Sequence, residues 1–231
     1  NWFFGQYAGL NFITGTPLID ASAFNAIPQT INTPEGCVTM SDNLGNLLFY
    51  SDGISVWNYD HEEITTLTLL GDPSASQCLV LPFPGNPVKY YLFHTPNFGF
   101  PGFYYSIIDM NLPCITCPSS GNGQITSPNT PIILPPGITK ISESITAVPK
   151  CNGIDYWVIV HSGTTNEFFE YSLTGAGFSG LTTAPTTYTS LGANWGQMKA
   201  SPNGQMIAVA KQTGSNSVAL YNFNNSTGQI T

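Results

Sequence analysis

The sequence predicts an all-β chain, arranged as a β-propeller of four-stranded antiparallel blades. Helical periodicity is almost missing, because no window of about 11 residues combines apolar side chains at the i, i+3, i+4 and i+7 positions with good helix formers between them. Short β-branched and aromatic runs, separated by clusters of Gly, Pro, Asn and Ser, indicate strands and turns instead. These runs recur in one order, at intervals close to the roughly 40–50 residues of a propeller blade.

Each repeat combines three predicted strands, which we name a, b and c in chain order. An apolar strand is followed by an Asn-Gly type of turn, a stronger apolar strand, a polar loop and an alternating aromatic strand. Fourth strands are predicted at 65–69 and 186–189. The longest interval between repeats predicts an insertion at 112–136, which has the Pro, Ser, Gly and Cys content of a surface loop. The repeats begin at Cys37, Cys78, Ile145 and Met198.

We expect a single, incomplete propeller domain spanning residues 1–231. About four blades are covered, which is fewer than a usual ring of about six to eight, so residues outside this chain would complete the ring. The predicted parts are closing strands and a linker (1–34), a blade (35–73), a blade with the insertion at 112–136 (74–140), a blade (141–192) and the start of a further blade (193–231).

The charge balance excludes several classes of function. Only 8% of residues are charged, all five cations are lysines, and the net charge is −8, whereas a typical domain is about 25% charged. Nucleic-acid binding needs clustered Lys and Arg, and anionic membrane surfaces attract the same residues. Phosphate clamps built from Arg are impossible here. No apolar run approaches the roughly 18 residues of a bilayer span, so we expect no direct membrane insertion.

Several motifs carry a family resemblance, most specifically within residues 1–73. They are NWFFG at 1–5, AGLNF at 8–12, EGC at 35–37, GNLLFYSDG at 45–53, VWN at 56–58, LGDP at 70–73, SPNG at 201–204 and NSV at 216–218. With them the chain resembles the propeller-bearing, gliding-motility-associated surface proteins of the Bacteroidetes. The resemblance implies an N-terminal propeller, export through the type IX secretion machinery and an extracellular, cell-surface location. It implies no catalytic residues.

His94 and His161 are placed alike in the repeat, at the end of strand b. Equivalent positions in neighbouring blades should lie about 10 Å or more apart, whereas the ligands of one metal ion lie about 2 Å from its centre. We therefore interpret these histidines as polar caps of strand b, and expect no metal and no cofactor.

The acidic segment 60–63 is the densest charge cluster, and its expected place is a solvated turn between strands c and d. Metal binding or general acid–base work is the alternative. No G-x-S-x-G, H-E-x-x-H or P-loop pattern occurs. A Ser/His/Asp triad stays open, because folding alone brings such residues together.

The b–c and d–a loops of a propeller emerge on one face, and this face is the predicted ligand-binding site. Exposed aromatic side chains beside carboxylates suit carbohydrate or peptide recognition. The alternatives are that Phe98 and Phe100 fold back over a neighbouring blade, and that Asp52 serves only a tight turn or binds calcium. The candidate residues are Asp52, Asp72, Phe98, Phe100 and Trp195.

Five cysteines leave at least one unpaired within the chain. Cys37 and Cys78 are predicted to be buried, inert thiols too far apart to bridge, since bonded cysteines need Cα atoms within about 7 Å. One disulfide is expected among Cys114, Cys117 and Cys151, either Cys114–Cys117 or one of these with Cys151. A zinc site from the three is the alternative. A disulfide would favour an oxidising, extracellular location.

We interpret the chain as a non-catalytic interaction or adhesion module of a secreted bacterial surface protein. Its partners would be proteins or carbohydrates at the cell surface. Two alternatives stay open: a propeller hydrolase or lyase acting on polysaccharide or lactone, and a structural cap of a surface filament. Carboxylates with raised pKa values in a deep pocket would favour the enzyme, and a shallow aromatic-rimmed face would favour binding.

Overall fold

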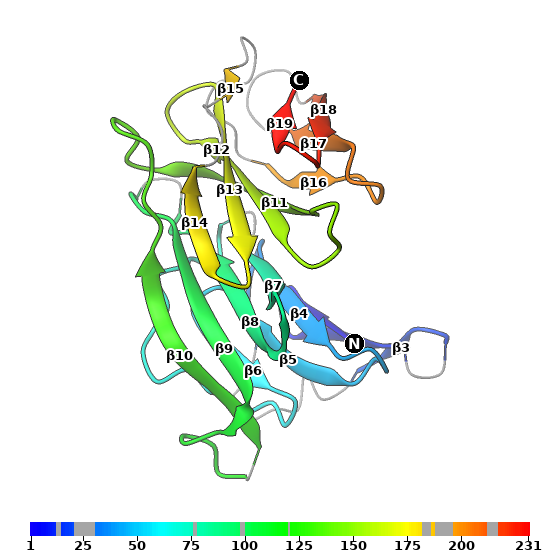
Figure 1. Ribbon diagram of the computed structural model, residues 1–231. Coiled ribbons are helices and arrows are strands. Elements are labelled where there is room, and N and C mark those ends of the chain that lie inside the picture. The colour runs from blue at the N-terminus through cyan, green and yellow to red at the C-terminus, as the bar shows by residue number, and fades with distance from the viewer. Residues whose placement is uncertain are drawn as a thin grey trace. The chain divides into compact units, whose positions relative to one another are not determined.

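The computed structural model describes residues 1–12, 15–20, 31–75, 78–97, 100–119, 121–181, 186–187, 196–211 and 217–231. Their regular elements are all strands, and each sheet follows the chain order as a meander (Figure 1). Consecutive strands pair antiparallel, as β8 with β9 and β12 with β13 do. The predicted fold class, an all-β chain of propeller-type antiparallel blades, is confirmed. Among these residues no helix has the length and apolar character that a membrane span requires.

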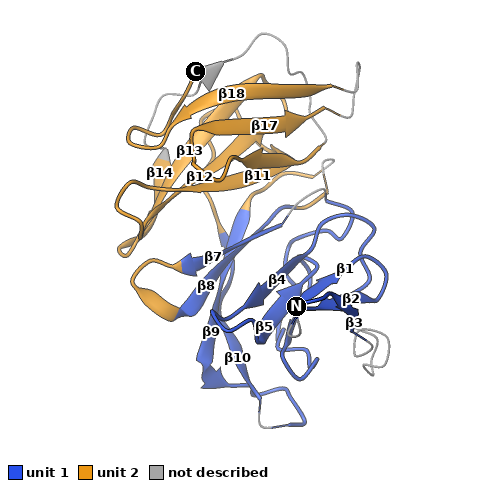
Figure 2. Ribbon diagram, turned by 90° about the vertical axis from the view of Figure 1, so that its right-hand side faces the viewer, with its two compact units in different colours: residues 1–82, 88–95, 104–130 blue, residues 83–87, 96–103, 131–231 orange. Residues whose placement is uncertain are grey.

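The chain divides into two compact units (Figure 2). The first comprises residues 1–82, 88–95 and 104–130, and the second comprises residues 83–87, 96–103 and 131–231. Because the chain forms two compact units, the expectation of one propeller domain stays a prediction.

Three sheets make up the first unit, and the middle one is covered on both faces. Side chains of β5 alternate, so Phe49 joins a core with Leu92 of β8, while Tyr50 stacks on Phe3 of β1 at 4.6 Å between ring centroids. The sheets are β1 (Trp2–Phe4), β2 (Ala8–Asn11) and β3 (Leu18–Ile19); β4 (Val38–Ser41), β5 (Leu47–Ser51) and β6 (Val56–Asn58); and β7 (Leu79–Phe83), β8 (Asn86–His94), β9 (Tyr104–Pro113) and β10 (Asn122–Pro131).

Two sheets make up most of the second unit, and they share one apolar core. Trp157 and Ile159 of β12 pack with Ile207 and Val209 of β17. Burial alternates along β17, whereas β12 is buried at every position from Trp157 to Ser162. The strands are β11 (Ile141–Pro149), β12 (Tyr156–Ser162), β13 (Glu167–Thr174), β14 (Gly177–Leu181) and β15 (Thr186–Thr187), and β16 (Met198–Ala200), β17 (Met206–Ala210), β18 (Val218–Asn224) and β19 (Gln229–Ile230).

The outer strands differ most from the prediction. No strand lies at 65–69, and the predicted insertion 112–136 contains β10, the fourth strand of its sheet. In the third repeat β14 and β15 both pair with β13, and β15 overlaps the predicted strand at 186–189. Edge strands pair on one side only, so they tolerate the Pro, Ser and Gly that mark loops in a sequence. The N-terminal strands form a sheet of their own within the first unit, and their role as closing strands stays a prediction.

Candidate functional site

Asp52 lies in the tight turn that joins β5 to β6, and local sequence builds this turn. Ser51 ends β5, accepts the Gly53 amide at 3.0 Å and donates its hydroxyl to the Ser55 carbonyl at 2.6 Å. Asp52 Oδ1 accepts the amides of Ile54 and Ser55, each at 2.9 Å. Gly53 has φ +89°, a conformation that suits glycine. The Ile54 and Ser55 amides thus both donate to Oδ1, and neither of them donates to Oδ2.

Burial raises the pKa of the Asp52 carboxyl above its ordinary value. Hydrogen bonds from the backbone amides oppose this shift, and the negative charge of Glu63 adds to it. The Ser55 hydroxyl donates to Glu63 Oε1 at 2.6 Å, so one residue contacts both acids. A half-buried carboxylate with a raised pKa is a suitable general base, because it accepts a proton more readily than an ordinary aspartate.

The segment that carries Asp72 lies directly against the Asp52 turn. A Cβ on Gly71 would collide with the Gly53 carbonyl oxygen, so the two backbones approach as closely as glycine allows. Asp72 is half-buried, and its Oδ1 accepts the Ser74 amide at 2.7 Å. The structure therefore brings together two of the predicted site segments, those of Asp52 and Asp72.

Of the other predicted ligand residues, only Phe100 is among the described residues. Phe100 is 65% exposed and belongs to the second unit, so its side chain is not folded back into a core. Phe98 and Trp195 lie outside the described residues.

Glu63 is a site residue that the sequence analysis missed. The acidic segment is a turn in which Asp60 and Glu63 are exposed, as predicted, and Glu63 also forms a β-bridge with Trp57 and accepts the Ser55 hydroxyl. The neighbouring His61 adopts φ +62° and places Nδ1 3.2 Å from the Tyr50 hydroxyl. These contacts tie the exposed turn to β5 and β6. No motif signals such an isolated bridge.

The pKa of His61 is lowered by burial, and the charges of Asp20 and Asp60 oppose the shift. The imidazole also lies against the Phe3 ring, 5.3 Å between centroids. A partly buried, mostly neutral imidazole at neutral pH follows from this environment.

His94 and Ser106 form a pair that resembles a base and its nucleophile. His94 Nε2 lies 3.0 Å from Ser106 Oγ, but the two residues are only 1% and 0% exposed. Ser106 Oγ also accepts the Asn129 amide at 3.0 Å, and Asn129 Oδ1 accepts the Leu70 amide at 2.8 Å. Burial lowers the pKa of His94 to about 4, partly offset by the Leu70 backbone. The pair is therefore a structural connection to the segment that precedes Gly71.

His161 and His94 do not occupy equivalent positions, contrary to the prediction. His94 shares its face of β8 with Leu92, which packs on the sheet that precedes β8. His161 shares its face of β12 with Ile159, which packs on the sheet that follows. A shift of one residue changes the face of a strand, and sequence alignment of short runs does not detect it.

His161 is fully buried, and neither ring nitrogen meets a hydrogen-bond partner among the described residues. It makes an edge contact with Phe168 at 5.0 Å. Burial lowers the pKa of His161 to about 4, while the Ser162 backbone opposes the shift. Both histidines are thus buried neutral side chains rather than polar caps at strand ends.

Of the disulfide pairings left open, the structure holds Cys114–Cys117, with Cα atoms 5.5 Å apart. Cys151 is an exposed free thiol. Cys37 and Cys78 form no disulfide and are half-buried rather than buried as predicted, and burial raises the pKa of Cys37. In the described part of the chain no group of three His, Cys, Asp or Glu side chains could hold a metal ion.

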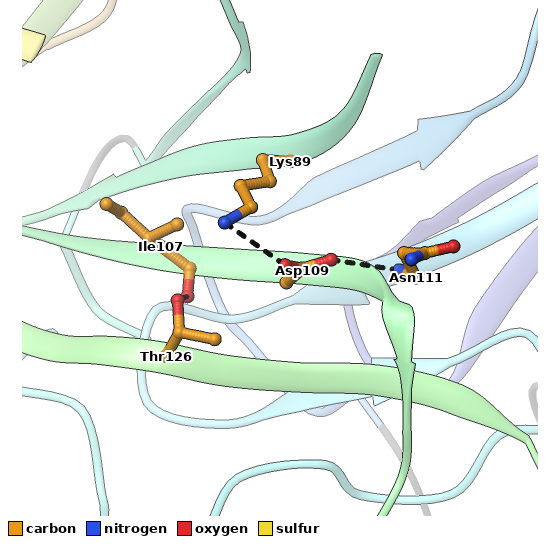
Figure 3. A network of polar contacts seen from close by, with 5 residues as sticks. All are labelled: Lys89, Ile107, Asp109, Asn111 and Thr126. Atoms are coloured by element: carbon orange, nitrogen blue, oxygen red, sulfur yellow. Dashed lines mark hydrogen bonds and ion pairs between the residues drawn. The ribbon is translucent and has the colours of Figure 1, made fainter. Parts of the chain in front are cut away.

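The first unit contains a single lysine and no arginine. Lys89 Nζ forms an ion pair with Asp109 Oδ2 at 3.2 Å, and Asp109 Oδ1 accepts the Asn111 amide at 3.0 Å (Figure 3). Thr126 Oγ1 donates to the Ile107 carbonyl at 3.4 Å and ties β10 to β9 in the same view. The one Lys or Arg side chain of this unit is therefore already engaged by a carboxylate.

No protein-family model matches the chain, and no curated protein matches it. Solved structures resemble it at low identity. A periplasmic gluconolactonase of Pseudomonas aeruginosa has 15% identity over 88% of this chain and a TM-score of 0.47. A proposed 6-phosphogluconolactonase of Bacteroides fragilis has 9% identity, with 94% of this chain and 73% of the other covered, and a TM-score of 0.46. A variant of AofleA from Arthrobotrys oligospora has 14% identity over 94% of this chain and 61% of the other, with a TM-score of 0.43.

The chain spans about half the length of the Pseudomonas aeruginosa gluconolactonase, 53%. The expectation of a non-catalytic adhesion module is nonetheless wrong. Two of the three compared structures are named for gluconolactonase activity.

Proposed function

We propose that the first unit carries part of a hydrolase active site that opens a neutral sugar lactone, with Asp52 as the general base. The observation that supports this is the raised pKa of Asp52, caused by burial and reinforced by Glu63. The compared lactonases supply the substrate class to be tested, whereas the reason for a hydrolytic role is the chemistry of the carboxylate.

In this reaction the Asp52 carboxylate takes a proton from a water molecule as the water oxygen attacks the lactone carbonyl carbon. The tetrahedral intermediate then collapses, the bond between the carbonyl carbon and the ring oxygen breaks, and the ring oxygen takes up the proton that the Asp52 carboxyl holds, which restores the carboxylate. The product is an open-chain hydroxy acid. A positioned general base contributes about 10²–10⁴-fold to such a step.

The charges around Asp52 favour an uncharged substrate. Glu63 contacts Ser55 of the Asp52 turn, and the segment that carries Asp72 lies against the same turn. The single lysine of the unit is paired with Asp109. A phosphorylated lactone would meet carboxylates without a compensating cation, and like charges repel. The anionic product would be repelled for the same reason, which aids its release.

The test uses the whole protein and follows acid release from glucono-δ-lactone above the spontaneous rate. D52N should lower turnover about 10²–10⁴-fold. D42N is the matched control, because Asp42 also accepts two turn amides but its pKa is lowered by the hydrogen bond from the Asn46 side chain rather than raised. Turnover by native protein no faster than by D52N, on lactones and on neutral polysaccharides alike, would falsify the hydrolase proposal. A phosphorylated lactone preferred over the neutral one contradicts the charge argument.

We also infer that the chain works in an oxidising compartment outside the cytoplasm. The Cys114–Cys117 disulfide supports this, because cytosolic thiols are kept reduced. Labelling of intact cells with a membrane-impermeant maleimide should modify the exposed Cys151 thiol. Labelling only after lysis contradicts a surface location. Export by type IX secretion stays a prediction.

A further inference from the structure

The Cys114–Cys117 disulfide closes the connection between β9 and β10 in the first unit. β9 ends at Pro113, and the Cys114 amide donates to the Gly121 carbonyl at 2.8 Å just before β10 begins. Ile115, between the two cysteines, is 71% exposed. Cys114 and Cys117 are half-buried and pack against the core that contains Leu92, so the disulfide is partly accessible to a reductant from within an exposed loop.

The disulfide loop, residues 114–119, holds the acidic loop, residues 58–63, by polar contacts. Ser119 donates its amide to Glu62 Oε1 at 3.0 Å and its hydroxyl to Glu62 Oε2 at 2.5 Å. Thr116 Oγ1 donates to the Glu63 carbonyl at 3.1 Å. Asn58 Nδ2 donates to Cys117 Sγ at 3.5 Å, so one sulfur of the disulfide is itself a contact.

The acidic loop in turn contacts the Asp52 turn. Glu63 Oε1 accepts the Ser55 hydroxyl at 2.6 Å, and the Ser55 amide donates to Asp52 Oδ1 at 2.9 Å. The continuous path runs from the Thr116 hydroxyl through Glu63 and Ser55 to the Asp52 carboxylate. Displacing Glu63 would change both a hydrogen bond and a charge next to Asp52.

A disulfide between residues three apart adds little to global stability, because the stabilisation that cross-linking confers grows with the length of the closed loop. Its main physical effect is local: it fixes the shape of the loop that presents Thr116 and Ser119. Local geometry, rather than the fold, is therefore what reduction would change.

We propose that Cys114–Cys117 is a redox site that controls the acidic loop and, through Glu63, the Asp52 carboxylate. The control of Asp52 rests on the proposed function, whereas the control of the loop does not. The reductant is a dithiol: it delivers two electrons and two protons, the S–S bond breaks into two thiols, and the dithiol becomes a disulfide.

Amide hydrogen exchange of the whole protein, oxidised and reduced, tests the proposal without reference to activity. The Asp60 and Glu62 amides, which donate to Asn58 Oδ1 at 3.0 Å, report on the acidic loop. Reduction should speed their exchange roughly tenfold, as expected when one or two hydrogen bonds are lost from a local equilibrium. C151S provides a background without the exposed thiol.

S119A is the second variant, because it keeps the disulfide and removes the hydroxyl contact to Glu62. S119A should speed amide exchange of the acidic loop in the oxidised protein. Reduction should then accelerate that exchange by a smaller factor than in the native protein. Unchanged exchange at 58–63 on reduction overturns the proposal, and so does equal acceleration throughout β8 and β9. If exchange responds to reduction while no lactone is turned over in either state, the redox site stands and the proposed function fails.

Discussion

Two turns in the two units share a frame and differ in chemistry. In the first unit the β5–β6 turn begins with the buried Ser51, whose Oγ accepts the Gly53 amide at 3.0 Å. In the second unit the β12–β13 turn begins with the buried Ser162, whose Oγ accepts the Thr164 amide at 3.1 Å. The serine cap is thus repeated, as expected of repeating units with the same local turn chemistry.

The residue after each serine makes the difference. In the first unit this residue is Asp52, and its carboxylate caps the rest of the turn. In the second unit it is Gly163, where a Cβ would lie 2.9 Å from the Ile141 carbonyl oxygen, so a side chain is excluded. A repeated frame therefore provides positions for function, and the packing around each copy decides which position holds a reactive group.

Substitution of the crowded glycines should have the largest effect on stability. G71A forces the Asp52 turn away from its neighbour, because the added Cβ meets backbone rather than a flexible side chain. We expect a loss of about 1–3 kcal/mol in the free energy of unfolding, with reduced lactone turnover. G163A meets a less severe contact and should lose less, without effect on turnover. Urea unfolding measures both, and a larger loss for G163A contradicts the comparison.

Removal of the serine caps should affect both turns alike. S51A and S162A each leave a turn amide without its acceptor, Gly53 in one unit and Thr164 in the other. We expect each to lower the free energy of unfolding by about 1–3 kcal/mol. Only S51A should also lower turnover. Equal loss of turnover in S162A would show that the second turn shares in the chemistry.

The buried histidines offer a smaller contrast. H94L removes the partner of the Ser106 hydroxyl and should lower the free energy of unfolding by about 1–3 kcal/mol. H161L removes an imidazole without a hydrogen-bond partner among the described residues, so it should change stability by less than about 1 kcal/mol or increase it. Thermal unfolding of the two variants at neutral pH distinguishes them, and a greater loss in H161L contradicts the assignment.

The smallest effect is a pH dependence of stability. The folded state raises the pKa of Asp52, so the protonated carboxyl is favoured on folding. Its stabilising effect is present below the ordinary Asp pKa and is lost as the pH rises through the raised value. D52N cannot ionise, so its stability relative to the native protein should increase over that window. A constant difference between the two proteins across this pH range contradicts the raised pKa.

Much of the fold could be predicted because its signals are local. Apolar runs such as 47–51 and 156–162 become strands, and Asp-Gly at 52–53 becomes a turn, since neighbouring residues alone set these conformations. β10 could not be predicted, because an edge strand is formed by its partner β9 and not by its own Pro- and Ser-rich composition.

The sequence by itself determined the strand-and-turn pattern, the scarcity of cations and the place of Asp52 in its turn. Only the tertiary structure decided that Gly71 lies against this turn, that Glu63 reaches Ser55 and that the disulfide loop holds the acidic loop. These contacts join residues distant in the chain, and burial and charge at Asp52 depend on them. A pKa is set by surroundings in space, and a linear pattern does not contain them.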